Sequence, residues 1–212
     1  MYNKKMNYYE ENAGFSKTAS QIAAYEAQVQ SCRDCPLALT RTQAVCGNRC
    51  YQGDIMLLGE APGAAEDRFG RPFAGAAGKL LQQFLAESQI PAERLYIGNA
   101  VKCRPVKPGK RPGAWRNRPP RPAEIAACRR HLQAELALVR PKLIVTLGAV
   151  PSSCFMPDKP QMGQCHGKPF AAGPYRIFPL YHPAAVMYNP GLRRAYEEDM
   201  QTLVRYIQNE MI

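Results

Sequence analysis

The sequence lacks a hydrophobic run that could cross a membrane. A spanning helix needs about 18 or more consecutive apolar residues, and the most apolar runs in this chain are Ile55–Leu58 and Leu143–Val150. The N-terminal segment is polar and tyrosine-rich, without the apolar core of a secretory signal peptide. We therefore expect a cytoplasmic protein that has no contact with a membrane.

Acidic residues are also scarce. The 212 residues include 17 Asp and Glu against 28 Lys and Arg, a formal net charge of +11. This excess favours a polyanionic partner, either nucleic acid or an anionic membrane face. Apolar residues make up 46% of the chain, which is typical of a globular domain and excludes wholesale disorder. We expect a flexible leader over residues 1–17, one domain over residues 18–212, and a monomer.

The common phosphate-binding loops are absent. Gly59–Gly63 follows a predicted strand, but it matches neither G-x-x-x-x-G-K-[ST] nor G-x-G-x-x-G. The first pattern is typical of nucleoside-triphosphate enzymes and the second of dinucleotide-binding proteins. Binding of ATP or of a dinucleotide is therefore poorly supported.

Short apolar runs alternate with amphipathic segments and predict an α/β fold. The predicted strands cover residues 54–59, 95–98, 143–148 and 175–181, and the predicted helices cover residues 20–30, 76–88, 123–139 and 193–208. This alternation predicts a parallel sheet with helices on both faces. Residues 60–75 and 104–122 are predicted to be loops, and the second contains six prolines and seven basic residues.

Polar side chains follow three of the predicted strands. Glu60, Asn99 and His182 come at the carboxyl ends of strands that are far apart in the sequence. In an open α/β sheet, ligands bind outside the carboxyl ends of the strands, so we expect these three side chains to converge on one crevice. A carboxylate, an amide and an imidazole suit polar recognition combined with acid–base or electrostatic chemistry.

Eight cysteines in a cytoplasmic chain favour metal binding or catalysis over disulfides. Cys32 and Cys35 form a C-x-x-C pair, Cys103 follows the second strand, and Cys128 lies in the third helix. Four thiolates can hold a [4Fe–4S] cluster or a zinc ion, and spacing alone selects neither the ligands nor the metal. Cys46 and Cys50 form a second possible pair, whereas Cys154 and Cys165 stand alone, and for any one of these four a buried free thiol is the favoured interpretation.

Two basic segments are candidates for DNA contact. The loop 104–122 combines its charges with Trp115, which favours phosphate contact and base stacking. The segment 188–194 has arginines beside an apolar residue, as in proteins that open a base stack with an apolar wedge. The candidate residues are Lys110, Arg111, Arg116, Arg118, Asn189, Leu192, Arg193 and Arg194.

These motifs together resemble the family 4 uracil-DNA glycosylases, the iron–sulfur branch of that superfamily. The matching pieces are Cys32-x-x-Cys35-Pro-Leu, Gly59-Glu-Ala-Pro-Gly63 with Glu66-Asp67, Gly70-Arg-Pro-Phe-Ala-Gly75, Asn99-Ala-Val-Lys-Cys-Arg-Pro105, Glu124 to Cys128, and His182-Pro-Ala184. The resemblance covers about residues 30–210. It implies a three-layer α/β/α fold around a four-stranded parallel sheet, and hydrolysis of the N-glycosidic bond of uracil in single- or double-stranded DNA. It also implies a structural [4Fe–4S] cluster held by Cys32, Cys35, Cys103 and Cys128.

The resemblance further implies roles for individual residues. The uracil leaves the base stack and enters a pocket, where Gly59 and Ala61 line the wall and Phe73 stacks on the ring. Asn99 would recognise the uracil edge, and His182 would donate a hydrogen bond to the departing uracil oxygen. Glu60 would position or activate water, or stabilise the positively charged sugar. Which of these roles Glu60 has is left open by the sequence.

Two features depart from the family pattern. Cys103 and Cys128 are separated by a longer basic stretch than is typical, and that stretch has no histidine that could bond covalently to an abasic sugar. His131 lies in the following helix and is expected on its surface. We therefore predict turnover. The alternatives are a covalent or non-catalytic uracil-DNA-binding relative on the same fold, and a zinc-stabilised nucleic-acid-binding module.

Overall fold

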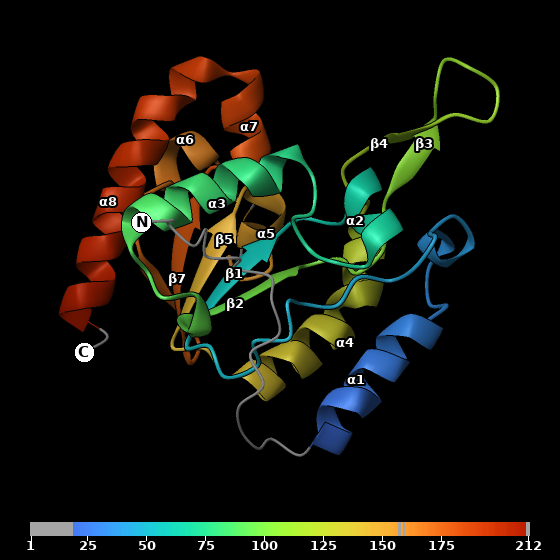
Figure 1. The fold of residues 1–212 in the computed structure, drawn as a ribbon, viewed down its shortest axis with the longest axis horizontal. Coiled ribbons are helices and arrows are strands. Elements are labelled where there is room, and N and C mark those ends of the chain that lie inside the picture. Colours follow the sequence, from blue (N-terminus) through green and yellow to red (C-terminus); the bar gives the residue numbers. More distant parts are fainter. Residues whose placement is uncertain (1–18, 157, 159, 211–212) are drawn as a thin grey trace, which may run out of the picture.

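The computed structural model describes residues 19–156, 158 and 160–210, and the predicted leader lies outside them. A five-stranded sheet with the order β2-β1-β5-β7-β6 forms the centre of the fold (Figure 1). Its strands are β1 (Ile55–Gly59), β2 (Leu95–Asn99), β5 (Leu143–Leu147), β6 (Phe170–Ala172) and β7 (Tyr175–Leu180). Strands β2, β1, β5 and β7 pair in parallel, whereas β6 pairs antiparallel with β7. The α/β class is confirmed, and the four predicted strands gain an edge strand that the sequence did not reveal.

Helices cover both faces of the sheet. On one face, Ile55 and Leu57 of β1 pack in a cluster with residues of α3 (Ala76–Ser88) and α8 (Arg193–Glu210). On the other face, Met56 and Leu58 pack in a cluster with residues of α1 (Ala19–Ser31) and α4 (Pro122–Val139). This division follows from the pleat, because successive side chains of a strand point to opposite faces. No helix among the described residues is long and apolar enough to span a membrane.

Part of the predicted loop 60–75 is a helix, α2 (Ala64–Phe69). It begins after Gly63, whose N–H donates to the Glu66 carboxylate, and it ends at Gly70, which has a left-handed φ of 69°. Six residues are too few to give a helical apolar period. The other short helices were missed for the same reason: η1 (Pro36–Leu39), η2 (Ala92–Arg94), α5 (Ala149–Ser153), α6 (Met162–Cys165), α7 (Pro183–Tyr188) and η3 (Pro190–Leu192).

The prediction that residues 104–122 form only a loop was wrong. They contain a β-hairpin of β3 (Val106–Pro108) and β4 (Trp115–Asn117), which projects from the body of the domain (Figure 1). Proline normally argues against a strand because it has no N–H to donate. A two-stranded ribbon has only edge strands, however, where that N–H is dispensable. Pro108 therefore pairs in register with Trp115.

Candidate functional site

A cavity of about 370 Å³ lies where the loops after β1, β2 and β7 meet. Its volume is within the range of small-molecule sites. Residues from five separate segments line it, among them Ala61, Phe73, Asn99, Asn117, His182 and Tyr188. The structure thus brings Asn99 and His182 to one cavity at the carboxyl edge of the sheet.

His182 lies at the start of α7 and is held in one orientation. Its Nδ1 accepts a hydrogen bond of 3.1 Å from the backbone N–H of Ala184. Burial lowers the pKa of His182 to about 4, because desolvation penalises the imidazolium. The ring is therefore neutral at physiological pH. Since Nδ1 is an acceptor, the proton is on Nε2, which can donate.

Asn99 ends β2 and is 4% exposed. It lies beside Gly59, its register partner on the neighbouring strand β1. A Cβ atom on Gly59 would stand 2.3 Å from Asn99 Oδ1 and 2.7 Å from Phe73 Cζ. Only glycine at position 59 therefore lets the amide and the phenyl ring approach the backbone this closely.

Phe73 is held in a strained backbone conformation. Its φ is 52°, in the left-handed region that a bulky residue rarely adopts. Its ring lies nearly parallel to the His182 imidazole, at an angle of 21° and 6.0 Å between centroids. Helix α3 presses against it from behind, because a Cβ on Gly78 would stand 1.7 Å from the Phe73 carbonyl oxygen.

Glu66 connects two loops of the cavity wall. Its carboxylate accepts the N–H of Gly63 at 3.0 Å and the N–H of Gly75 at 2.8 Å. It joins the segment after β1 to the segment that precedes α3, and Phe73 lies between them in the chain. The sequence motif includes Glu66, but its two backbone partners become visible only in the structure.

Glu60 is half-buried next to the cavity, and it is not among the residues that line it. Its carbonyl oxygen accepts the N–H of Val101 at 3.0 Å, which joins the ends of β1 and β2. Burial raises the pKa of the Glu60 carboxyl above its ordinary value. A carboxylate in this position has little water to solvate its charge.

The four predicted ligand cysteines line one small cavity between η1 and α4. Three of their sulfur atoms accept N–H hydrogen bonds: Cys103 from Arg41 Nη1 at 2.9 Å, Cys128 from the Lys102 N–H at 3.3 Å, and Cys32 from Arg130 Nη2 at 3.6 Å. Burial raises the pKa of the Cys103 and Cys128 thiols, to about 11 for Cys128. Metal binding requires thiolates, and N–H donors of this kind stabilise them.

His131 contradicts our expectation of a surface residue. It is 3% exposed and lines the cysteine cavity. It lies one helical turn after Cys128 on the same face of α4, which explains its burial. Its Nε2 has no hydrogen-bond partner among the described residues. A ring nitrogen, the Cys32 sulfur and an Asp34 oxygen lie within 4.8 Å of one another.

The other four cysteines lie away from this cavity. Cys50 Sγ donates to the Glu93 carbonyl at 3.1 Å, and Cys154 Sγ donates to the Val150 carbonyl at 3.6 Å. Cys165 Sγ lies 3.9 Å from Met162 Sδ, and burial raises the pKa of Cys46 to about 12. All four are free thiols in the structure.

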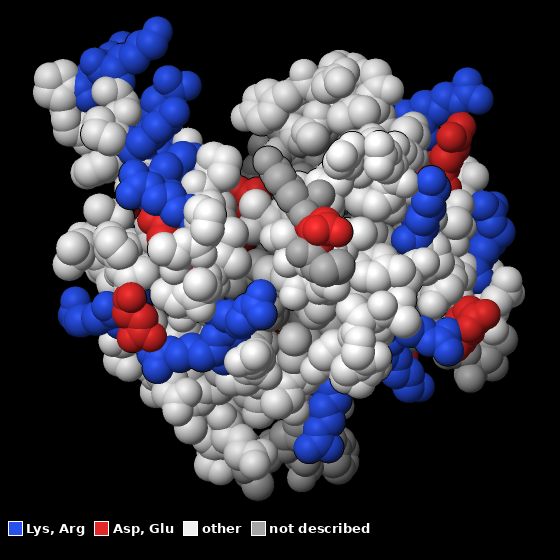
Figure 2. All heavy atoms as spheres, turned by 180° about the vertical axis from the view of Figure 1, so that it is seen from behind, with Lys and Arg blue, Asp and Glu red and all other residues white. Residues whose placement is uncertain are grey.

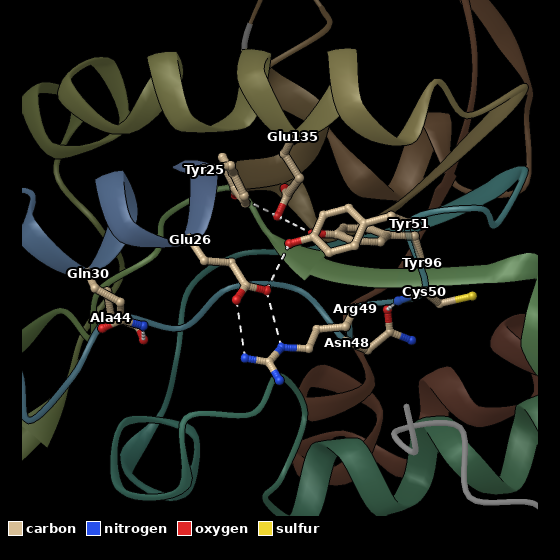
Figure 3. A network of polar contacts seen from close by, with 10 residues as sticks. All are labelled: Tyr25, Glu26, Gln30, Ala44, Asn48, Arg49, Cys50, Tyr51, Tyr96 and Glu135. Carbon is tan, nitrogen blue, oxygen red and sulfur yellow. Dashed lines mark hydrogen bonds and ion pairs between the residues drawn. The ribbon is translucent and has the colours of Figure 1, made fainter. Parts of the chain in front are cut away.

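Lys102 connects the two sites. Its backbone N–H contacts Cys128, and its buried Nζ donates to the Asn99 carbonyl and to Glu135 Oε2, both at 2.6 Å. Glu135 Oε1 accepts the hydroxyls of Tyr96 at 2.7 Å and Tyr25 at 3.0 Å (Figure 3). The side chain of Lys102 is 1% exposed and that of Glu135 is 0% exposed. Every charge in this network is thus paired or hydrogen-bonded, as burial requires.

Comparison with known proteins assigns the family. The model of the Uracil DNA glycosylase superfamily matches residues 47–207. The chain belongs to this superfamily. The type-4 uracil-DNA glycosylase of Sulfurisphaera tokodaii is 39% identical over 186 residues, which are 83% of this chain and 80% of that protein. The type-4 enzyme of Thermotoga maritima is 38% identical over 187 residues, 86% of this chain and 93% of that protein.

The resemblance to the type-4 branch is therefore confirmed. A type-5 uracil-DNA glycosylase of Thermus thermophilus is also similar, at 30% identity over 159 residues, but these are only 60% of this chain. The four clustered cysteines and the type-4 relatives are both compatible with an iron–sulfur cluster.

Basic residues of this protein gather on the projecting hairpin, at the upper left of Figure 2. Lys110, Arg111 and Arg116 are exposed. Arg118 differs, because its guanidinium forms a bidentate pair with the buried Glu124 at 2.7 and 2.6 Å. It also donates to the Val106 carbonyl at 2.9 Å. Arg118 thus anchors the base of the hairpin, and its side chain is only 15% exposed.

The segment 189–194 of this superfamily member also differs from our expectation for an apolar wedge. Leu192 is half-buried against the core, and Asn189 Oδ1 accepts the N–H of Gly191 at 3.2 Å. Arg193 and Arg194 are exposed and pair with glutamates one helical turn later. The exposed apolar residues at the cavity rim are Met187, 43% exposed, and Tyr188, 88% exposed, at the start of the predicted segment 188–194.

Proposed function

We propose that this protein removes uracil from DNA by hydrolysing the N-glycosidic bond, leaving an abasic site. One observation carries the proposal: a half-buried, neutral His182 with its proton on Nε2 shares a small cavity with Asn99 and Phe73. These are the imidazole, amide and aromatic ring that uracil excision needs. The type-4 uracil-DNA glycosylases to which the chain is similar support the same activity.

Recognition precedes the chemistry. A base inside a duplex is inaccessible, so the uracil must be flipped into the cavity. Phe73 stacks on its ring, and the Asn99 amide accepts from uracil N3–H and donates to O4. Cytosine presents an unprotonated N3 and an amino donor, so it mismatches both contacts. Gly59 and Ala61 leave room for the base to approach the backbone.

The bond breaks as negative charge collects on the departing uracil. The Nε2–H of His182 donates to uracil O2 and stabilises that charge without moving a proton, as an oxyanion hole does. Glu60, next to the cavity, either holds the water that attacks the sugar or stabilises the positive charge that develops on the sugar. A Glu60→Gln variant separates its two roles, because glutamine can still hold a water molecule but has no negative charge.

Cys32, Cys35, Cys103 and Cys128 are proposed to hold a [4Fe–4S] cluster. Bound there, the cluster would crosslink the segment after α1 to the loop after β2 and to α4, and it would supply no chemistry to the reaction. Visible absorbance and iron analysis of the purified protein test this directly. Zinc in a colourless protein would favour the nucleic-acid-binding module instead.

DNA contact is proposed for both rims of the cavity. Lys110, Arg111 and Arg116 contribute charge from the hairpin, and Arg193 and Arg194 contribute it from the start of α8. Met187 and Tyr188 replace Leu192 as the proposed wedge, because they are exposed at the cavity rim. We propose that the protein acts as a monomer in the cytoplasm.

A single gel tests the proposed activity. A labelled oligonucleotide with one uracil is incubated with the protein and divided between hot alkali and plain denaturant. Strand cleavage that depends on alkali, without a shifted band, is the expected result. A band that stays shifted in denaturant would instead indicate covalent capture. No cleavage and no shift would contradict the proposal. A His182→Asn variant is the control for contaminating glycosylase.

A further inference from the structure

The projecting hairpin has two chemically different faces. In an antiparallel pair, residues directly opposite each other share a face, and the face alternates along each strand. The register pairs Val106 with Asn117, Lys107 with Arg116, and Pro108 with Trp115. One face of the ribbon therefore carries Trp115 and Asn117 with their apolar partners. The opposite face carries the basic pair.

The face with Trp115 is the one that meets the uracil cavity. Asn117 lines the cavity, and its Nδ2 would be 3.3 Å from a Cβ on Gly63. Its Oδ1 accepts a hydrogen bond of 2.8 Å from Arg104 Nε, which fixes the side chain. Trp115 is two residues away on the same strand, so it continues this face outward from the cavity.

Trp115 is 52% exposed and belongs to neither hydrophobic core. Burial in the domain therefore does not account for the large apolar ring. The other rim of the cavity presents a second exposed ring, Tyr188. Two exposed aromatic side chains, with basic residues close to one of them, are the composition of a surface that binds unpaired bases.

We propose that Trp115 is a stacking platform for an unpaired base next to the flipped uracil, which makes single-stranded DNA the preferred substrate. This inference rests on the proposed glycosylase function. A base held in a duplex stacks on its neighbours and offers no free face to a protein ring. An unpaired base offers both faces, whatever its sequence. Lys107 and Arg116, on the other side of the ribbon, contact backbone phosphates.

The chain contains a single tryptophan, so its fluorescence reports on this platform in the unmodified protein. The probe is a uracil-free oligothymidylate of about 12 nucleotides, within the site sizes of single-strand binders. Stacking quenches indole fluorescence, so we expect saturable quenching by the single strand and little by the same strand annealed to its complement. Free N-acetyltryptophanamide corrects for absorbance of light by the DNA. Absent quenching, or equal quenching by both forms, would overturn the proposal.

Trp115→Ala, Trp115→Phe and Arg116→Ala form a matched set on adjacent positions of one strand. We expect Trp115→Ala to lower kcat/KM for uracil in single strands roughly tenfold and to change the duplex value less than twofold. Trp115→Phe should retain most of the activity. Arg116→Ala should weaken the binding of both substrates and reduce the salt dependence of that binding.

The proposal is wrong if Trp115→Ala lowers kcat/KM equally for single-stranded and duplex uracil, or for neither of them. The glycosylase function and the Trp115 stacking platform can fail independently of each other in this experiment. If the unmodified protein excises no uracil from either substrate, the glycosylase function fails. Quenching by single strands would then still show whether the platform exists. Melting temperatures of the variants, expected to be unchanged for an exposed residue, exclude misfolding.

Discussion

The burial of His182 has a consequence for stability that can be calculated. Its pKa is about 4 in the folded protein and 6.5 without the fold. Below pH 6.5 the unfolded chain binds a proton that the folded chain excludes, so the free energy of unfolding falls as the pH falls toward 4. At pH 5 this linkage removes about 2 kcal/mol relative to neutral pH.

A His182→Asn variant isolates this contribution. Asparagine is a good N-cap, so its side-chain oxygen can still accept the Ala184 N–H, but it does not titrate. We expect the unfolding free energy of the unmodified protein to drop by about 2 kcal/mol more than that of the variant between pH 7 and pH 5. The variant should also lose about 100-fold or more in kcat, because the donor to uracil O2 is gone.

Urea denaturation of both proteins at pH 7, 6 and 5 measures the difference, in which all other titrating groups cancel. Parallel pH dependences would refute the argument, because they would mean that the imidazole is protonated as easily in the fold as in the unfolded chain. The desolvation that keeps the Nε2–H donor neutral below pH 6.5 would then be absent as well.

Further variants test the supports of the site. Gly78→Ala should displace Phe73 and lower kcat/KM about 100-fold. The control is Gly163→Ala, whose Cβ would be 3.9 Å from its nearest neighbour and should leave kcat/KM unchanged. Steady-state kinetics of the two variants measure the difference. Lys102→Met should destabilise the fold by about 3–5 kcal/mol, and adding Glu135→Gln should recover much of that loss in urea denaturation because no charge stays buried alone. An unchanged stability in the single variant would show that the pair is solvated. A triple alanine variant of the hairpin should reduce the slope of log K against log salt by about 2 to 3 in a binding titration, and an equal slope would exclude phosphate contact by Lys110, Arg111 and Arg116.

The sequence predicted the central elements well. β1 is apolar on both faces because helices cover both sides, so the run Ile55–Leu58 marks a buried parallel strand directly. Helix α3 has the predicted bounds, since its apolar residues repeat with the helical period. Asn99 and His182 were found because polar residues at strand ends meet at one edge of a parallel sheet.

Features that depend on tertiary contacts were missed. Helix α2 is defined by hydrogen bonds at its ends and has no apolar period. The strand β6 has three residues and becomes visible only through its pairing with β7. His131 appeared polar and exposed, but the turn of α4 that buries Cys128 also buries it. Arg118 appeared to be one more basic residue of the loop until Glu124 was found beneath it.

Lys102 makes the two sites of this protein mutually dependent. Its backbone N–H contacts the Cys128 sulfur, and its side chain donates to the Asn99 carbonyl. Neither site can therefore be redesigned alone. A change that moves Asn99 also alters the surroundings of Cys128, because Lys102 lies between them. Loss of the proposed cluster would in the same way disturb Asn99 and the uracil recognition proposed for it.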